Sequence, residues 1–238
     1  MIDRELYLPK EWTDDRERCR DAGIPDEARF ATKPVLAQRM IARAADGGVP
    51  FGWVTGDEAY GVDTKLRVWL ESEDIAHVLA VAKNSMVVTM GLTKARVAGV
   101  VGALAEDSWT RMSCGDGARG PRVYDWAVVD IRPLRLPGRG HWLLARRSLT
   151  DTTKIAYYVC FGPADTTVEE LVRVAGCRWA IEESFQTAKN ETGLDHYQVR
   201  GYDAWYRHIT LSMVAAAFLV ITRDAAKKGA LRSTAMSR

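Results

Sequence analysis

The sequence predicts an α/β protein in which a sheet packs against helices. Helix-like and strand-like segments alternate in the first third of the chain, which is typical of parallel strands joined by helices. Three strand-like runs then follow one another between residues 125 and 161, which predicts an antiparallel meander. The chain has 238 residues, of which 47% are apolar, so it is long enough for one large domain with a sizeable core.

The segment before residue 50 begins with residues 5–9, a short run typical of the end of a strand, and continues into a polar stretch. Apolar residues at helical spacing then predict a helix over residues 33–45, which Gly47 and Gly48 end.

The next segment predicts two parallel strands. Residues 50–56 form a short apolar run that enters Asp57, and residues 76–82 form a second buried strand. A short helix over residues 66–72 lies between them. This order places Asp57 at the carboxyl end of a buried strand.

The middle of the chain predicts a sheet-rich region. Residues 84–124 mix glycine, small residues and charges, and the glycine-rich residues 115–121 predict a loop. The meander that follows comprises residues 125–131, 141–148 and 154–161.

Two helices end the chain. Thr166 and Thr167 followed by two glutamates predict a helix start, and this helix covers residues 167–190. A last helix covers roughly residues 204–223. Its apolar run, residues 209–221, is shorter than a bilayer requires, so we interpret it as a buried core helix with no membrane role.

Composition excludes several classes of protein. The first residues lack the apolar centre of a signal peptide, and none of the four cysteines forms a C-x-x-C pair, so zinc-ribbon, redox and secreted classes are disfavoured. A reduced cytoplasmic protein fits best. Net charge is only +2, which neither favours nor excludes nucleic acid.

Residues 131–150 carry five arginines and no acid, and such a stretch can neutralise phosphates. On charge alone a solvated hairpin is the better interpretation. The arginines are Arg132, Arg135, Arg139, Arg146 and Arg147.

Two carboxylates from distant segments are candidates for chemistry. Asp57 follows a buried strand, where α/β folds place functional groups, although a turn-capping role is the commoner one for such an Asp. Arg178, Glu182 and Lys189 share one face of a helix, although such a face is usually just solvated. Paired acids can hold a hard divalent ion for phosphodiester chemistry.

At these residues the chain resembles the insertion-sequence transposases that carry a DDE catalytic triad on an RNase H-like fold, and more narrowly an actinobacterial-type group with a β-rich insertion. Four stretches, spanning nearly the whole chain, carry the resemblance: residues 4–9 with 22–25, residues 53–61, residues 115–120 leading into 124–127, and residues 178–189 followed by 193–197.

The resemblance implies roles for the candidate residues. Asp57 corresponds to the second catalytic Asp, and Glu182 rather than Glu183 to the catalytic Glu, both as ligands of Mg²⁺ or Mn²⁺. Lys189 would contact the DNA end, and Arg178 would support a phosphate or Glu182. The family motif has a tyrosine where this sequence has Ala175.

The family's first catalytic Asp belongs to a strand upstream of the stretch with which this chain begins. Asp14 and Asp15 lie in a polar run and do not resemble strand-borne ligands. We therefore expect an N-terminally truncated, catalytically impaired copy that lacks the first core strand.

The resemblance also implies a division of the chain. Residues 1–83 would form a partial RNase H-like core, 84–163 the β-rich insertion, and 164–238 the catalytic and C-terminal helices. The insertion would contact DNA through Arg146, Arg147 and Trp126, although each tryptophan is by itself better explained by strand packing.

The expected function is therefore metal-dependent cleavage and strand transfer at transposon ends, with double-stranded DNA as partner. A non-catalytic DNA-binding remnant and a metal-dependent nuclease on an RNase H-like core are the alternatives. The protein could also form a homodimer, which the sequence does not decide.

Overall fold

A computed structural model describes residues 1–117, 120–132 and 138–235, with side chains described up to residue 226. The chain divides into two compact units. Unit 1 comprises Met1–Thr32, Arg39–Gly47 and Ile181–Arg238, and unit 2 comprises Lys33–Gln38 and Gly48–Ala180. Helices α3 (Lys33–Asp46) and α7 (Val168–Thr192) contribute to both units. Arg135, named above, lies outside the described residues, as do residues 118–119 of the stretch 115–121.

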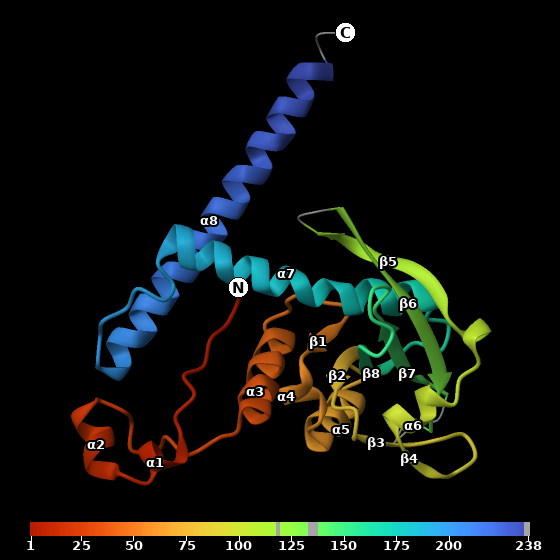
Figure 1. Ribbon diagram of the computed structural model, residues 1–238. Coiled ribbons are helices and arrows are strands. Elements are labelled where there is room, and N and C mark those ends of the chain that lie inside the picture. The colour runs from red at the N-terminus through yellow and green to blue at the C-terminus, as the bar shows by residue number, and fades with distance from the viewer. Residues whose placement is uncertain (118–119, 133–137, 236–238) are drawn as a thin grey trace. The chain divides into compact units, whose positions relative to one another are not determined.

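Unit 2 is built on a curled six-stranded mixed sheet with the strand order β1-β2-β8-β7-β6-β5 (Figure 1). β1 and β2 are parallel, and every other neighbouring pair is antiparallel. The α/β class, the parallel pair and the β6-β7-β8 meander are therefore confirmed, and the fold is compatible with an RNase H-like architecture. The strands are β1 (Val54–Gly56), β2 (His77–Val81), β5 (Thr110–Gly117), β6 (Gly120–Asp130), β7 (Gly140–Arg147) and β8 (Ile155–Gly162).

Apolar side chains cover both faces of this sheet. On one face, Leu171 and Val172 of α7 pack with Trp126 and Leu144 of the strands. On the other face, Val97 and Val101 of α6 (Val97–Gly102) pack with Leu143 and Val159. The remaining elements of this unit are α4 (Glu58–Gly61), α5 (Thr64–Ser72), the strands β3 (Met86–Val88) and β4 (Lys94–Arg96), and the 3₁₀ helix Glu106–Ser108.

The expectation of a loop at residues 115–121 is wrong for the residues of that stretch that the structure describes, 115–117 and 120–121. They belong to β5 and β6, which pair as antiparallel strands with Asp116 opposite Pro121 and Gly117 opposite Gly120, and the register shifts between Ser113 and Asp116. Gly115 and Gly120 adopt positive φ angles of 107° and 105°, which only glycine reaches at low cost. Glycines that predicted an irregular loop instead allow a bulged strand pair.

The strands of the expected insertion, residues 84–163, fall into two sheets. β5 to β8 extend the sheet that contains β1 and β2, whereas β3 and β4 pair in a separate two-stranded sheet. The division of the chain at residue 83 stays a prediction about family organisation.

In unit 1, the short helices α1 (Lys10–Thr13) and α2 (Arg16–Asp21) precede α3, and α8 (Tyr202–Ala235) ends the chain. The expected strand end at residues 5–9 is wrong, because these residues pair with no strand. The Leu6 N–H donates to the Tyr206 hydroxyl at 3.3 Å, and Arg43 binds Asp3 and Glu5. Side chains of Tyr206 and Arg43, and not a neighbouring strand, thus hold this N-terminal segment.

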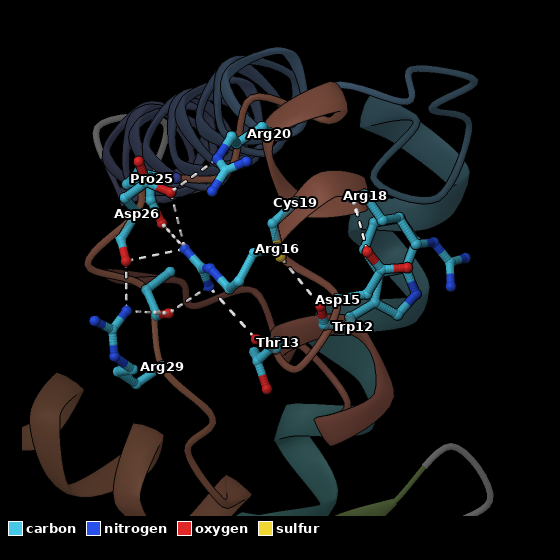
Figure 2. Close-up of polar contacts among 11 residues, drawn as sticks. Trp12, Thr13, Asp15, Arg16, Arg18, Cys19, Arg20, Pro25, Asp26 and Arg29 are labelled. Carbon is cyan, nitrogen blue, oxygen red and sulfur yellow. Dashed lines mark hydrogen bonds and ion pairs between the residues drawn. The ribbon is translucent and has the colours of Figure 1, made fainter.

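One arginine holds the α1–α2 region together, as Figure 2 shows. Arg16 donates to the carbonyl oxygens of Ala28 at 3.2 Å and Asp26 at 2.9 Å, and it also binds the Asp26 carboxylate. Asp15 caps α2 by accepting from the Arg18 N–H at 3.0 Å. Asp15 is therefore the N-terminal cap of α2. This agrees with the prediction that no strand carries Asp15.

The interpretation of residues 209–221 as a buried core helix is wrong. Ile209 is buried, but Leu211, Phe218 and Ile221 are 64%, 64% and 67% exposed. The helix also extends well beyond the apolar run. Among the described residues, one segment, Tyr202–Ala226, is long and apolar enough to cross a membrane by length and composition alone.

Candidate functional site

Asp57 lies where β1 ends and α4 begins. Its Oδ1 accepts a hydrogen bond from the Ala59 N–H at 2.9 Å, so it caps the short helix. Asp57 therefore has the turn-capping role considered above. Capping uses one carboxylate oxygen, and the second oxygen is available to bind a ligand. Its negative charge, after burial, contributes to the raised pKa of the Tyr60 hydroxyl.

The backbone around Asp57 is held close to β2. Gly61, the last residue of α4, lies so near the Ala80 carbonyl that any side chain there would overlap it. Arg67 of α5 donates to the Gly61 carbonyl oxygen at 2.5 Å. The carboxylate is therefore presented by a short helix clamped against the parallel strand pair.

Glu182 lies on α7 and lines a surface hollow of about 530 Å³ in unit 1. Lys189 lines the same hollow, as its position two turns further along the helix predicts. Asp195, for which the sequence suggested no role, also lines it, and its Oδ2 lies 3.9 Å from the Lys189 Nζ. The structure thus brings Glu182, Lys189 and Asp195 together.

Two predicted DNA-binding arginines belong to unit 2, Arg146 on β7 and Arg178 on α7. Burial raises the pKa of the Tyr158 hydroxyl, and the positive charges of Arg146 on β7 and Arg178 on α7 oppose that rise. The Arg146 guanidinium also stacks 4.6 Å from the centre of the Tyr124 ring.

Arg122 anchors α7 to the β5–β6 hairpin. It donates to the Gly176 carbonyl oxygen at 3.1 Å and to the Cys114 carbonyl oxygen at 3.2 Å, and its guanidinium lies 5.1 Å from the centre of the Trp179 ring. The sequence alone carried no signal for this role, because an arginine on a strand usually faces solvent. Its contacts hold the part of α7 that precedes Glu182.

Two of the residues predicted to contact DNA have partners within the chain, and a DNA role for Arg147 stays a prediction. Trp126 is 1% exposed, and its indole N–H donates to the Met112 carbonyl at 3.2 Å, so it is a core residue and not a base-stacking one. Arg147 binds the carboxylates of Glu106 and Asp125 and stacks on Trp109, so local acids already neutralise it. The strand-packing interpretation of the tryptophans is correct for Trp126.

Asp57 belongs to unit 2, and Glu182 belongs to unit 1 next to the boundary at Ala180. Their approach to a shared metal ion stays a prediction. Within the described ranges, no three His, Cys, Asp or Glu side chains gather as a metal site. The oxygen donors fit Mg²⁺, which binds through one or two carboxylates and keeps several waters.

Residues 1–100 match the model of a family described as DDE superfamily endonuclease. The matched region contains Asp57, β1 and β2, so the match confirms the resemblance to DDE-type, transposase-like proteins. Endonucleases of this superfamily act on DNA and generally use divalent metals. Among curated proteins, none matches the chain.

Proposed function

We propose that the chain serves metal-dependent phosphodiester cleavage and strand transfer at the ends of a mobile DNA element. The observation that carries the proposal is the position of Asp57, at the carboxyl end of β1 and inside the region that matches the DDE endonuclease family. Functional groups of α/β folds gather at this edge of parallel strands. As part of the proposal, the protein works in the cytoplasm, where its DNA lies.

Asp57 and Glu182 would supply two carboxylate ligands for Mg²⁺ or Mn²⁺. A bound divalent ion supplies an activated nucleophile and charge stabilisation for in-line displacement at phosphorus. Lys189 would hold the DNA end beside Glu182, because both line one hollow. Arg146 and Arg178 would bind backbone phosphates near Tyr158.

The first test measures metal binding. We expect the purified chain to bind Mn²⁺ in a calorimetric titration, and Asp57→Asn and Glu182→Gln each to weaken binding about tenfold, since each removes one anionic ligand. Glu183→Gln, on the neighbouring exposed residue, is the matched control and should bind like the wild type. Equal binding by all four proteins would contradict the assigned ligands.

A second candidate function is DNA binding without cleavage, and the positive charges of Arg146 and Arg178 in unit 2 favour it. Incubation of supercoiled plasmid with the chain and Mn²⁺ separates the two candidates. Nicking that Asp57→Asn abolishes supports catalysis. Binding of the plasmid by wild type and Asp57→Asn alike, with no nicking by either, supports the binding function instead.

A further inference from the structure

The β3–β4 hairpin ends in a turn with an uncommon residue at its strained position. The Leu92 N–H donates to the Thr89 carbonyl at 2.9 Å, and the Thr89 N–H donates to the Thr93 carbonyl at 3.0 Å. These bonds enclose a three-residue loop, Met90, Gly91 and Leu92, whose last residue takes the left-handed conformation with φ 64°. Glycine is the usual residue there. A leucine is therefore held where the fold itself would favour glycine.

The apolar side chains of this turn project into solvent. Met90 is 60% exposed and Leu92 is 67% exposed. Val87 on β3, in contrast, is buried in the cluster with Val97 and Ile131. The base of the hairpin is thus anchored to the core, while its tip contributes nothing to that core.

Exposed basic residues lie on β4 and next to the hairpin. Lys83, Lys94, Arg96 and Arg132 are exposed, and the Arg132 N–H joins the hairpin by donating to the Val88 carbonyl at 2.8 Å. The sequence contains no acid between Asp74 and Glu106. The hairpin therefore combines an apolar tip with flanks that attract a polyanion.

We propose that Met90 and Leu92 form a wedge that inserts between base pairs of duplex DNA, while the flanking basic residues bind the phosphates on both sides. Apolar side chains inserted at a base step unstack it and kink the duplex. The inference rests on the proposed DNA function and adds the element that would deform the substrate. An anionic membrane would suit the same composition, but the hairpin lies inside the region that matches the DDE endonuclease family, which favours DNA.

The decisive variant is Leu92→Gly, because it removes the more exposed of the two wedge side chains and relieves the left-handed backbone at the same time. We expect its melting temperature to equal or exceed that of the wild type. We expect its affinity for a short fluorescein-labelled duplex of mixed sequence, measured by anisotropy with the full chain, to fall about tenfold. Loss of binding by a chain that is no less stable cannot come from misfolding.

Unstacking itself is measured with 2-aminopurine placed in the same duplex. The wild type should raise its fluorescence, and Leu92→Gly should not. Leu92→Met, which keeps a large apolar side chain, should restore both signals. Leu149→Gly makes the same exchange at an exposed residue in the turn between β7 and β8, and it should behave like the wild type.

The basic flanks are tested by salt dependence. Lys94→Ala and Arg96→Ala should each lower the slope of log affinity against log salt by about 1, because each removes one phosphate contact. Leu92→Gly should leave that slope unchanged, because an apolar side chain releases no counterion. A slope altered as much by Leu92→Gly as by Lys94→Ala would contradict an apolar wedge.

The outcomes separate this inference from the proposed function. Equal duplex affinity and equal 2-aminopurine fluorescence for the wild type and Leu92→Gly would overturn the wedge alone. A wild-type chain that binds no duplex at low salt would overturn both. Binding to phosphatidylserine-containing vesicles that depends on Leu92, with none to DNA, would assign the tip to a membrane and overturn the wedge.

Discussion

At the scale of the residue, His77 shows how burial alters chemistry away from the candidate site. It is fully buried at the start of β2, and its ring stacks on Phe161 at 5.7 Å between centroids. Burial lowers the pKa of the imidazole to about 4, although the Ile75 carbonyl and the Glu71 carboxylate act in the opposite direction. Arg67 and His141 lower it further. His77 is therefore neutral in the folded chain at physiological pH.

This burial predicts a loss of stability in acid. The unfolded imidazole titrates near its ordinary pKa of about 6.5. Between that value and about 4 the unfolded chain therefore binds a proton that the folded chain does not. The free energy of unfolding is therefore unaffected by this group above pH 6.5. It decreases as the pH falls from 6.5 toward 4, by roughly 3 kcal/mol in total.

Urea unfolding of the wild type and His77→Leu at pH 7 and pH 4.5 measures this contribution. We expect the free energy of unfolding to fall more steeply in the wild type than in the variant, because the variant lacks the imidazole. Parallel pH dependences in the two proteins would show that His77 is not the responsible group.

At the scale of the element, α7 depends on a close approach to the β5–β6 hairpin. A side chain on Gly176 would overlap the carbonyl oxygen of Cys114, which is backbone and cannot move aside cheaply. Arg122 bridges the carbonyls of the same two residues. The helix that carries Glu182 therefore rests on the sheet through a glycine contact.

We predict that Gly176→Ala lowers the free energy of unfolding by about 1–3 kcal/mol, the usual range for overpacking. Gly99→Ala is the matched control, because a side chain there meets nothing within 4 Å on α6. It should stabilise the protein by about 0.5–1 kcal/mol through helix propensity. Chemical denaturation measures the free energy of unfolding of both variants. Equal changes in the two variants would contradict a close contact between Gly176 and Cys114.

At the scale of the whole molecule, the two candidate metal ligands belong to different units. Asp57 is in unit 2 and Glu182 is in unit 1, and α7 runs through the boundary. The proposed function therefore requires one ion to take a ligand from each unit.

We predict an effect of millimolar Mg²⁺ on a chain that carries two spin labels, attached to cysteines introduced in place of Lys65 in unit 2 and Glu183 in unit 1. Mg²⁺ should narrow the distribution of distances between the two labels. Both positions are exposed, and Cys177, an exposed thiol, is replaced by serine to keep labelling specific. Pulsed electron resonance measures the distribution. Asp57→Asn should abolish the response to Mg²⁺, and an identical response in that variant would contradict coupling through Asp57.

The sequence by itself determined the features that depend on neighbours along the chain. Helical spacing and capping placed α3, α5 and α7 within a few residues of their bounds, and the short apolar runs placed β1 and β2. The same local patterns placed Asp57 at a strand end, and Glu182 and Lys189 on one helical face. These signals come from backbone periodicity, which a few consecutive residues define.

Only the tertiary structure decided what each side chain faces. Trp126 is core and Arg147 is neutralised, because residues distant in sequence, Met112 and Glu106, come to lie beside them. Leu211, Phe218 and Ile221 of α8 are exposed although the composition of the segment predicted burial. Leu92 lies at a turn position that glycine usually occupies. Burial and charge pairing depend on which distant segments meet, and no local period in the sequence encodes that.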